Sequence, residues 1–235
     1  MNVEVVLLPR DLKPGRLKGR ACVVFDVLRA TSTMAAALQA GVEAIHLFDN
    51  LDAARVAAQS HRGARLLCGE AQCVAPAGFN LGNSPGQFIS SHRGATMFMC
   101  TTNGTRALLA AREAAVLFTG AIVNATAVAE AVRRTGRNVT LLCAGTNGEV
   151  AMEDVIGAGA VIAALRPDEM NETARIALNA FEAARHHLAG VLGETIGGIN
   201  VRQAGLAQDI DFAARLDAVP VVGVAAGDPL IVTRA

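Results

Sequence analysis

The sequence predicts an α/β protein with three layers, in which helices cover both faces of a largely parallel or mixed β-sheet. Two observations lead to this prediction. Short apolar runs alternate with alanine-rich segments of helical character along most of the 235 residues, as in folds built from strand–helix–strand units. The apolar runs are also continuous rather than interrupted by polar residues, which is typical of strands that are buried on both faces.

The candidate strands are short runs rich in valine, leucine, isoleucine and phenylalanine, a composition that favours extended structure. They are residues 3–8, 21–25, 44–48, 65–68, 95–100, 116–118, 139–143 and 219–225. Near the end of the chain, Gly227-Asp228-Pro229 lies between two apolar stretches. Glycine and proline at that point indicate a hairpin-like turn.

The candidate helices lie between these strands, and several carry recognisable end signals. They are residues 33–39, 51–59, 105–114, 125–134, 153–165, 171–188 and 200–216. Gly41 and Gly136 follow predicted helices, where a left-handed cap is expected. Asp52 and Asn124 lie near predicted helix starts, where an acceptor side chain satisfies free N–H groups.

The chain is expected to form one unit over residues 1–235, because no change in composition marks a linker. Any division into two closely packed lobes should fall near residues 120–140. The segment 69–91 has no clear periodicity and is rich in glycine, proline and asparagine. Loops of this length inside a compact domain usually have a function.

Composition and charge exclude several classes of protein. The chain is 52% hydrophobic and 18% charged, which excludes intrinsic disorder. Its net charge is zero, and its eight aromatic residues other than histidine are all phenylalanine, so we expect no nucleic acid and no membrane as a partner. No apolar run approaches the ~20 residues that a membrane span requires. Five cysteines in or beside apolar runs are typical of reduced thiols, so we expect a cytoplasmic protein.

The carboxyl ends of parallel strands are where ligands bind in such sheets, close to the N-termini of the following helices. Four predicted strands lead into small polar residues there, in segments 23–33, 65–70, 98–106 and 141–150. Backbone N–H groups, threonine hydroxyls and helix dipoles in these turns would suit an anion. The sequence therefore predicts a phosphate-type pocket at this edge of the sheet.

Acidic residues recur at the same strand ends or in the turns after them: Asp26, Glu70, Glu149, Glu153 and Asp154. Each has a simpler explanation when taken alone. Asp26 could bind a cation or could equally serve as a helix cap or a partner of Arg29, and acids at a helix start such as Glu153-Asp154 suit the helix dipole. Taken together, they favour a Mg²⁺ site made of oxygen ligands beside the pocket. Arg29 and Arg106 could add bidentate contacts to an oxyanion.

Two other segments bear on function. Residues 78–85 place Phe79 and Leu81 between glycine and asparagine, which indicates a loop anchored over a site. Cys100 and Arg106 have the Cys-x5-Arg spacing of thiolate phosphatases, although Met99 stands where those enzymes usually carry histidine. A thiolate phosphatase and a non-catalytic anion-binding protein are therefore the alternatives to a metal-dependent phosphatase.

Several motifs in this order give a resemblance that spans nearly the whole chain. They are residues 26–33 (DVLRATST), Gly69-Glu70, residues 78–85 (GFNLGNSP), residues 101–105 (TTNGT), residues 143–145 (CAG) and Glu153-Asp154. In these motifs the sequence resembles the 2-phosphosulfolactate phosphatase family. The resemblance implies a Mg²⁺-dependent enzyme of coenzyme M biosynthesis that hydrolyses (R)-2-phospho-3-sulfolactate to sulfolactate and phosphate. It also implies a three-layer fold and a homodimer. The sequence departs from the family at Asn80, usually aspartate, and at residues 71–74, usually a basic stretch with glycine.

The residues and the resemblance together predict a site for a small phosphorylated, sulfonated or carboxylated substrate. The predicted metal ligands are Asp26, Glu70, Glu153 and Asp154, and the predicted catalytic residues are Asp26, Arg29, Glu70 and Asp154. The predicted substrate-binding residues are Thr31, Ser32, Thr33, Asn83, Ser84, Thr101, Thr102, Asn103, Gly104 and Thr105. The nucleophile is either a metal-activated water or Asp26. Whether Asp209 and Asp211 reach the site is left open by the sequence.

Overall fold

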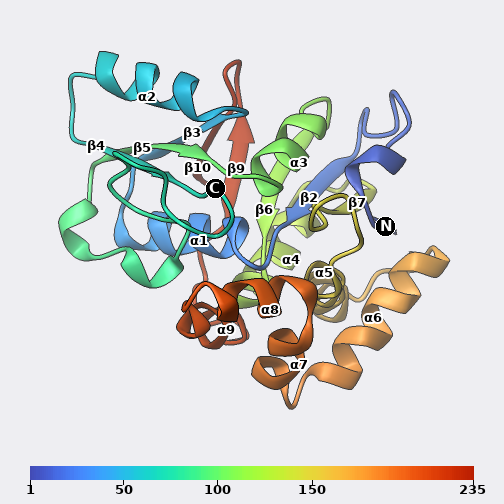
Figure 1. Ribbon diagram of the computed structural model, residues 1–235. Helices are drawn as coiled ribbons and strands as arrows, with labels where there is room; N and C mark the ends of the chain where they lie inside the picture. Colours follow the sequence, from blue (N-terminus) through green and yellow to red (C-terminus); the bar gives the residue numbers. More distant parts are fainter.

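The computed structural model describes all 235 residues, which fold around one ten-stranded sheet (Figure 1). The strands are β1 (Asn2–Val6), β2 (Ala21–Phe25), β3 (Ala44–Phe48), β4 (Arg65–Gly69), β5 (Thr96–Cys100), β6 (Val116–Gly120), β7 (Val139–Cys143), β8 (Glu169–Met170), β9 (Gly223–Ala226) and β10 (Ile231–Arg234). Their order across the sheet is β4-β5-β3-β10-β9-β6-β2-β7-β1-β8.

Helices connect most of these strands. They are α1 (Ala30–Ala40), α2 (Leu51–Ser60), α3 (Gly104–Ala110), α4 (Ala125–Arg134), α5 (Met152–Leu165), α6 (Glu172–Ala184), α7 (Leu188–Glu194), α8 (Ile196–Gln203) and α9 (Ala207–Ala213). No helix is long and apolar enough to cross a membrane.

The sheet consists of two parallel blocks joined by an antiparallel hairpin. Strands β4, β5 and β3 form one block, and β6, β2, β7, β1 and β8 form the other. The hairpin of β9 and β10 pairs antiparallel with β6 on one side and with β3 on the other. The two blocks therefore run in opposite directions along the sheet, which makes the sheet mixed.

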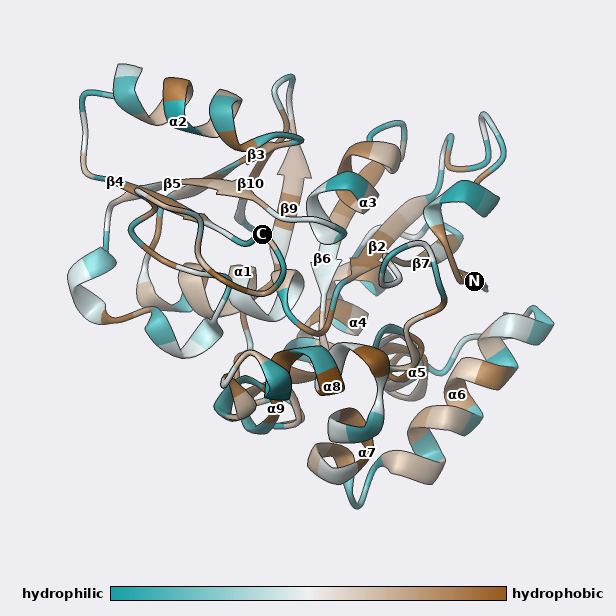
Figure 2. Ribbon diagram, viewed as in Figure 1, coloured by the Kyte–Doolittle hydropathy of each residue, from teal (hydrophilic) through white to brown (hydrophobic).

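Hydrophobic cores lie on both faces of the sheet, because successive residues of a strand point to opposite sides. In β2, Val23 and Phe25 belong to a cluster of 33 buried residues that includes α4, α5 and α6. Cys22 and Val24 belong to a second cluster of 27 that includes α1 and α3. Figure 2 shows apolar colour along β2 and β5, whereas α2 carries hydrophilic segments and buries only two alanines. The three-layer α/β/α prediction is confirmed.

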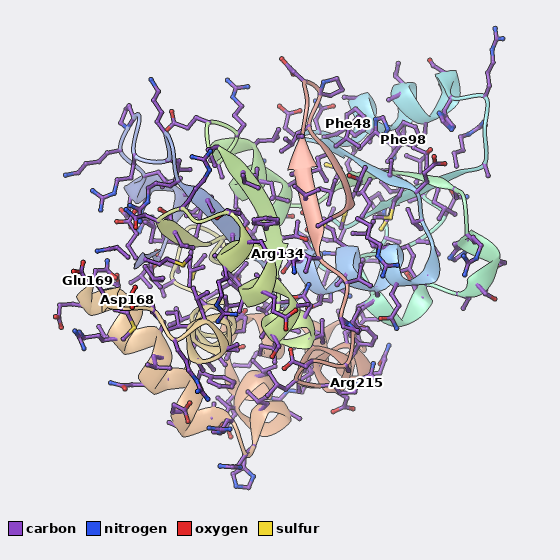
Figure 3. All side chains as sticks on the ribbon, turned by 180° about the vertical axis from the view of Figure 1, so that it is seen from behind. Phe48, Phe98, Arg134, Asp168, Glu169 and Arg215 are labelled. Atoms are coloured by element: carbon purple, nitrogen blue, oxygen red, sulfur yellow. The ribbon has the colours of Figure 1, made fainter.

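Aromatic side chains cover the β3–β5 part of the sheet. Phe48 on β3 and Phe98 on β5 lie side by side with ring centroids 6.1 Å apart (Figure 3). His46 stacks on Phe98 at 5.2 Å, and His61 at the end of α2 meets the same ring edge-on at 5.5 Å. This cluster packs α2 onto its block and lies apart from the site described below.

Some predicted elements are wrong in extent. The predicted helix 200–216 is two helices, α8 and α9, because Gly205 between them has a left-handed φ of 76°. The predicted helix 171–188 ends at Ala184, and pairing in the predicted strand 219–225 begins only at Gly223. The hairpin around residues 227–229 is confirmed, and so is the left-handed cap at Gly41. The sheet continues across residues 120–140, and the lobe boundary there stays a prediction.

Candidate active site

A cavity of about 550 Å³ lies beyond the carboxyl ends of four strands. Its walls come from the segments after β2, β4, β5 and β7, together with α8: Asp26, Leu28, Arg29, Glu70, Gln72, Cys73, Val74, Asn83, Thr102, Asn103, Thr146, Asn147, Gly197, Asn200, Gln203 and Ala204. The cavity lies at the strand ends, where the sequence predicts a phosphate-type pocket. Most of its lining side chains are polar.

Both blocks of the sheet border this cavity although they run in opposite directions. Five pairings separate β5 from β2, and each pairing rotates the next strand by about 20–25°. The accumulated twist is therefore roughly 100°. Figure 1 shows this twist: β4 and β5 run roughly horizontally in the view, whereas β9 runs roughly vertically. The twist brings the carboxyl end of β5 round to the carboxyl end of β2.

Asp26 follows β2 directly and is only 7% exposed. Its Oδ1 accepts the N–H of Ala30 at 3.2 Å, so it caps the start of α1 and lies on the cavity wall at the same time. Burial, followed by the nearby charges of Glu70 and Glu153, raises the pKa of Asp26 to about 6. A Cβ on Gly104 would lie 2.6 Å from Oδ2 of Asp26. Glycine at this position allows the segment after β5 to approach Asp26.

Glu70 follows β4 and connects two of the cavity-lining segments. Its Oε1 accepts the N–H of Thr102 at 2.7 Å, and its Oε2 accepts the N–H of Cys73 at 3.1 Å. These two bonds fix the carboxylate between the turns that follow β4 and β5. No arginine or lysine forms an ion pair with Asp26 or Glu70.

Arg29 is buried in a network of its own. Its Nη1 donates to Ser84 Oγ at 3.0 Å and to Asp209 Oδ2 at 2.7 Å, and its Nη2 donates to the carbonyl oxygen of Cys73 at 2.7 Å. Arg29 therefore pairs with Asp209 rather than with Asp26. Asp209 is buried beside the cavity, whereas Asp211, two residues further on, is exposed.

Glu153 and Asp154 are buried at the start of α5 and do not line the cavity. Asp154 accepts the N–H of Val27 at 2.8 Å and that of Gly145 at 3.0 Å, so it ties the ends of β2 and β7 together. Burial, followed by the charges of Asp26 and Glu153, raises the pKa of Asp154 despite these bonds. Burial also raises the pKa of Glu153, and its Oε2 has no hydrogen-bond partner.

Most of the predicted substrate-binding hydroxyls are used within the protein. Thr31 donates to the Asp26 carbonyl, Ser32 to the Val27 carbonyl and Thr33 to the Asn83 carbonyl. Thr101 and Thr105 bond to each other at 3.0 Å between hydroxyl oxygens. None of these five side chains lines the cavity, and neither does Ser84.

Three of the predicted substrate-binding residues do reach the cavity: Asn83, Thr102 and Asn103. Asn83 is buried, and its Oδ1 has no hydrogen-bond partner. The prediction missed Gln72, Thr146, Asn147, Asn200 and Gln203 as lining residues. The similarity of segments 98–106 and 141–150 could have located Thr146 and Asn147. No sequence signal marked the two residues of α8.

The chemistry of the other candidates is less suited to catalysis. Burial raises the pKa of Cys100 to about 11, as do the charges of Glu70 and Asp49, so the thiol stays protonated at neutral pH. Arg106 and Glu149 are exposed and do not line the cavity. No three histidine, cysteine or acidic side chains lie close enough together to hold a metal ion among themselves.

Fold and cavity together define a three-layer α/β protein whose site lies at the strand ends. The model of the 2-phosphosulpholactate phosphatase family matches residues 6–228. A protein of Carboxydothermus hydrogenoformans named a probable 2-phosphosulfolactate phosphatase is 36% identical over 94% of this chain and 92% of its own length. One of the same name from Synechococcus sp. (strain JA-3-3Ab) is 37% identical over 91% of each chain. This chain belongs to the 2-phosphosulfolactate phosphatase family.

Proposed function

We propose that this protein is a phosphoric monoester hydrolase that acts on the phosphate ester of a small 2-hydroxy acid, with (R)-2-phospho-3-sulfolactate as the first candidate. One observation carries the proposal. Asp26, Glu70 and Thr102 belong to three separate motifs that resemble the family, yet all three line one cavity. The match of the family model over residues 6–228 supports the same reading.

The charges at the cavity support a requirement for Mg²⁺. A substrate with phosphate and acid groups is strongly negative, and the only basic residue on the wall, Arg29, is already paired with Asp209. Asp26 and Glu70 add negative charge without a basic partner, and the pKa of Asp26 is raised first by burial and then by the charges of Glu70 and Glu153. A bound cation would relieve the repulsion and attract the substrate.

The donor set fits Mg²⁺ in its usual binding mode. Mg²⁺ commonly takes one or two protein carboxylates and completes its shell with waters and phosphate oxygens. Asp26 and Glu70 would hold it at the cavity wall, and Glu153, buried behind the wall, would act on the site through its charge. Asp154 would act behind them, because both of its oxygens accept backbone N–H groups. When bound, the ion would neutralise phosphate charge in the transition state.

The protein's own groups would orient the phosphate. Arg29 keeps N–H donors free after its bonds to Ser84, Asp209 and Cys73, and these suit phosphate oxygens. The amide N–H groups of Asn83 and Asn103 and the hydroxyl of Thr102 would complete the contacts. In the reaction a nucleophile attacks phosphorus, the ester P–O bond breaks, and the leaving oxygen takes a proton to give the 2-hydroxy acid. The nucleophile is water or Asp26, with a phosphoaspartate hydrolysed in the second case.

Phosphate release tests the proposal directly. The purified protein is assayed with 2-phosphosulfolactate and a panel of other 2-phospho-carboxylic acids, in Mg²⁺ and in EDTA. Release that requires Mg²⁺ is expected, with 2-phosphosulfolactate the best substrate. Equal release in EDTA, together with inactivation on alkylation of Cys100, would favour the thiolate phosphatase. Binding of phosphate without turnover of any ester would favour the non-catalytic anion-binding protein.

The homodimer, the cytoplasmic location and the place in coenzyme M biosynthesis stay predictions from the sequence. Light scattering coupled to size-exclusion chromatography measures the first of these. A mass of one chain at micromolar concentration would contradict the expected dimer.

A further inference from the structure

Asp209 joins the C-terminal helices to the site by a buried ion pair. It lies on α9, 180 residues from Arg29 in sequence, and the two side chains are 1% and 2% exposed. Its Oδ2 accepts both Nη1 of Arg29 and the hydroxyl of Ser84, each at 2.7 Å. Three segments far apart in the chain therefore meet at one carboxylate oxygen.

We propose that Asp209 is a positioning residue that holds the guanidinium of Arg29 at the cavity wall for the phosphate; this rests on the proposed function. Arginine has five N–H donors in a rigid fork. Asp209, Ser84 and the Cys73 carbonyl take three of them. These three bonds hold the fork in place, with two N–H donors left for a ligand.

The same pair controls where the positive charge lies. An arginine without Asp209 would be drawn to Asp26 and Glu70, the two unpaired carboxylates on the same cavity wall. It would then occupy the place that we assign to the cation. Holding Arg29 on Asp209 keeps Asp26 and Glu70 free. A role in stability alone is a weak explanation, because buried ion pairs often stabilise a fold no more than apolar residues of similar volume.

The first experiment is a double-mutant cycle with Asp209→Asn and Arg29→Gln. Asparagine keeps an acceptor oxygen but removes the charge, and we expect kcat/KM to fall about 100-fold, the scale of a misplaced catalytic group. The loss should appear in both KM and kcat, since Arg29 would contact the phosphate in the bound ester and in the transition state. In the Arg29→Gln background, Asp209→Asn should have no further effect. Losses that multiply would overturn the proposal, because Asp209 would then act independently of Arg29.

A matched control separates positioning from stability. Glu4 is also a buried carboxylate paired with arginines, Arg16 and Arg20, but it does not line the cavity. Glu4→Gln should lower the melting temperature and change kcat/KM less than twofold. Ser84→Ala removes one bond to the guanidinium and keeps both charges, and it should lower kcat/KM about tenfold. If Asp209→Asn does not fold, Ser84→Ala carries the test, and wild-type kinetics in it would overturn the proposal.

Two binding measurements distinguish this inference from the proposed function. Titration calorimetry with inorganic phosphate should show at least tenfold weaker binding to Asp209→Asn than to the wild type. The Mg²⁺-induced rise in melting temperature should also be smaller in the variant, because Arg29 then competes for the carboxylates. If the wild type releases no phosphate from any ester, the proposed function fails while both measurements still test Asp209. Equal phosphate affinity in the two proteins would overturn the role of Asp209.

Discussion

Asp26 combines burial with the absence of a basic partner. It is 7% exposed, and burial, followed by the charges of Glu70 and Glu153, raises its pKa to about 6. A carboxylate held charged in such a place costs free energy. That cost is reasonable at a site that binds a cation and unexpected at a residue that serves only to cap a helix.

The first prediction concerns Asp26→Asn in metal-free protein. Because the folded pKa lies above the usual value of 3.8, ionisation of Asp26 destabilises the fold above about pH 6 and has no effect below about pH 4. The variant should therefore be more stable at pH 8, by up to about 3 kcal/mol, and the difference should vanish near pH 4. Thermal unfolding in EDTA from pH 4 to 8 measures this, with exposed Asp52→Asn as the control. Phosphatase activity should be abolished. A constant difference at all pH values would contradict the assignment.

Cys73 is the only cysteine of the five that is not buried, and it lines the cavity. Burial raises the pKa of Cys73, so the reaction with iodoacetamide is carried out at pH 9, where a larger fraction of the thiol is ionised. We expect one modified residue in the folded protein, Cys73, with loss of activity as the cavity fills. Peptide mass spectrometry locates the label, and Cys73→Ser should be resistant to inactivation. A label on Cys100 instead would revive the thiolate mechanism.

At the scale of elements, α8 is fitted to the site through a glycine. The hydroxyl oxygen of Thr195 accepts the N–H of Gly198 at 3.1 Å and caps the start of the helix. Gly197 packs so closely against Glu153 that a Cβ at this position would lie 1.9 Å from Oε1 of Glu153. The polar residues Asn200 and Gln203 then reach the cavity from the same helix. The position of α8 therefore depends on Glu153.

Gly197→Ala should accordingly destabilise the protein by about 1–3 kcal/mol, because the methyl group would displace either Glu153 or the helix. Gly190→Ala in α7 is the matched control, since no atom lies within 4 Å of its Cβ position. That variant should be more stable by roughly 0.5–1 kcal/mol. Urea unfolding of both variants gives the two values. Equal stabilities would mean that α8 is free to shift.

The elements also show what a sequence can and cannot predict. Asp26 and Glu70 were predictable because each follows an apolar strand, and strand ends meet at one edge. Thr31, Ser32 and Thr33 looked equally suitable, but their hydroxyls bond to nearby carbonyls, a local choice that residue type does not reveal. Asn200 and Asp209 were not predictable as site residues, because their position depends on how α8 and α9 pack against distant segments.

At the scale of the whole molecule, the cavity has more acid than base, and a cation should stabilise the entire fold. Mg²⁺ at 100 times its dissociation constant would add about 2.7 kcal/mol, which for a chain of this size raises the melting temperature by several degrees. Thermal unfolding with MgCl2, against KCl at equal ionic strength, measures the shift. Asp26→Asn should lose most of it. An unchanged melting temperature in the wild type would argue against a metal at this site.

The hairpin of β9 and β10 lies in the middle of the sheet, although its residues come after those of every other strand. During synthesis the hairpin therefore emerges from the ribosome after the two blocks of the sheet that the hairpin joins. We expect a chain released at residue 222 to hold two unjoined half-sheets with exposed strand edges, which trypsin would digest much faster than the full chain. Because the cavity draws on both blocks, we expect a chain to become active only after its synthesis has passed β10.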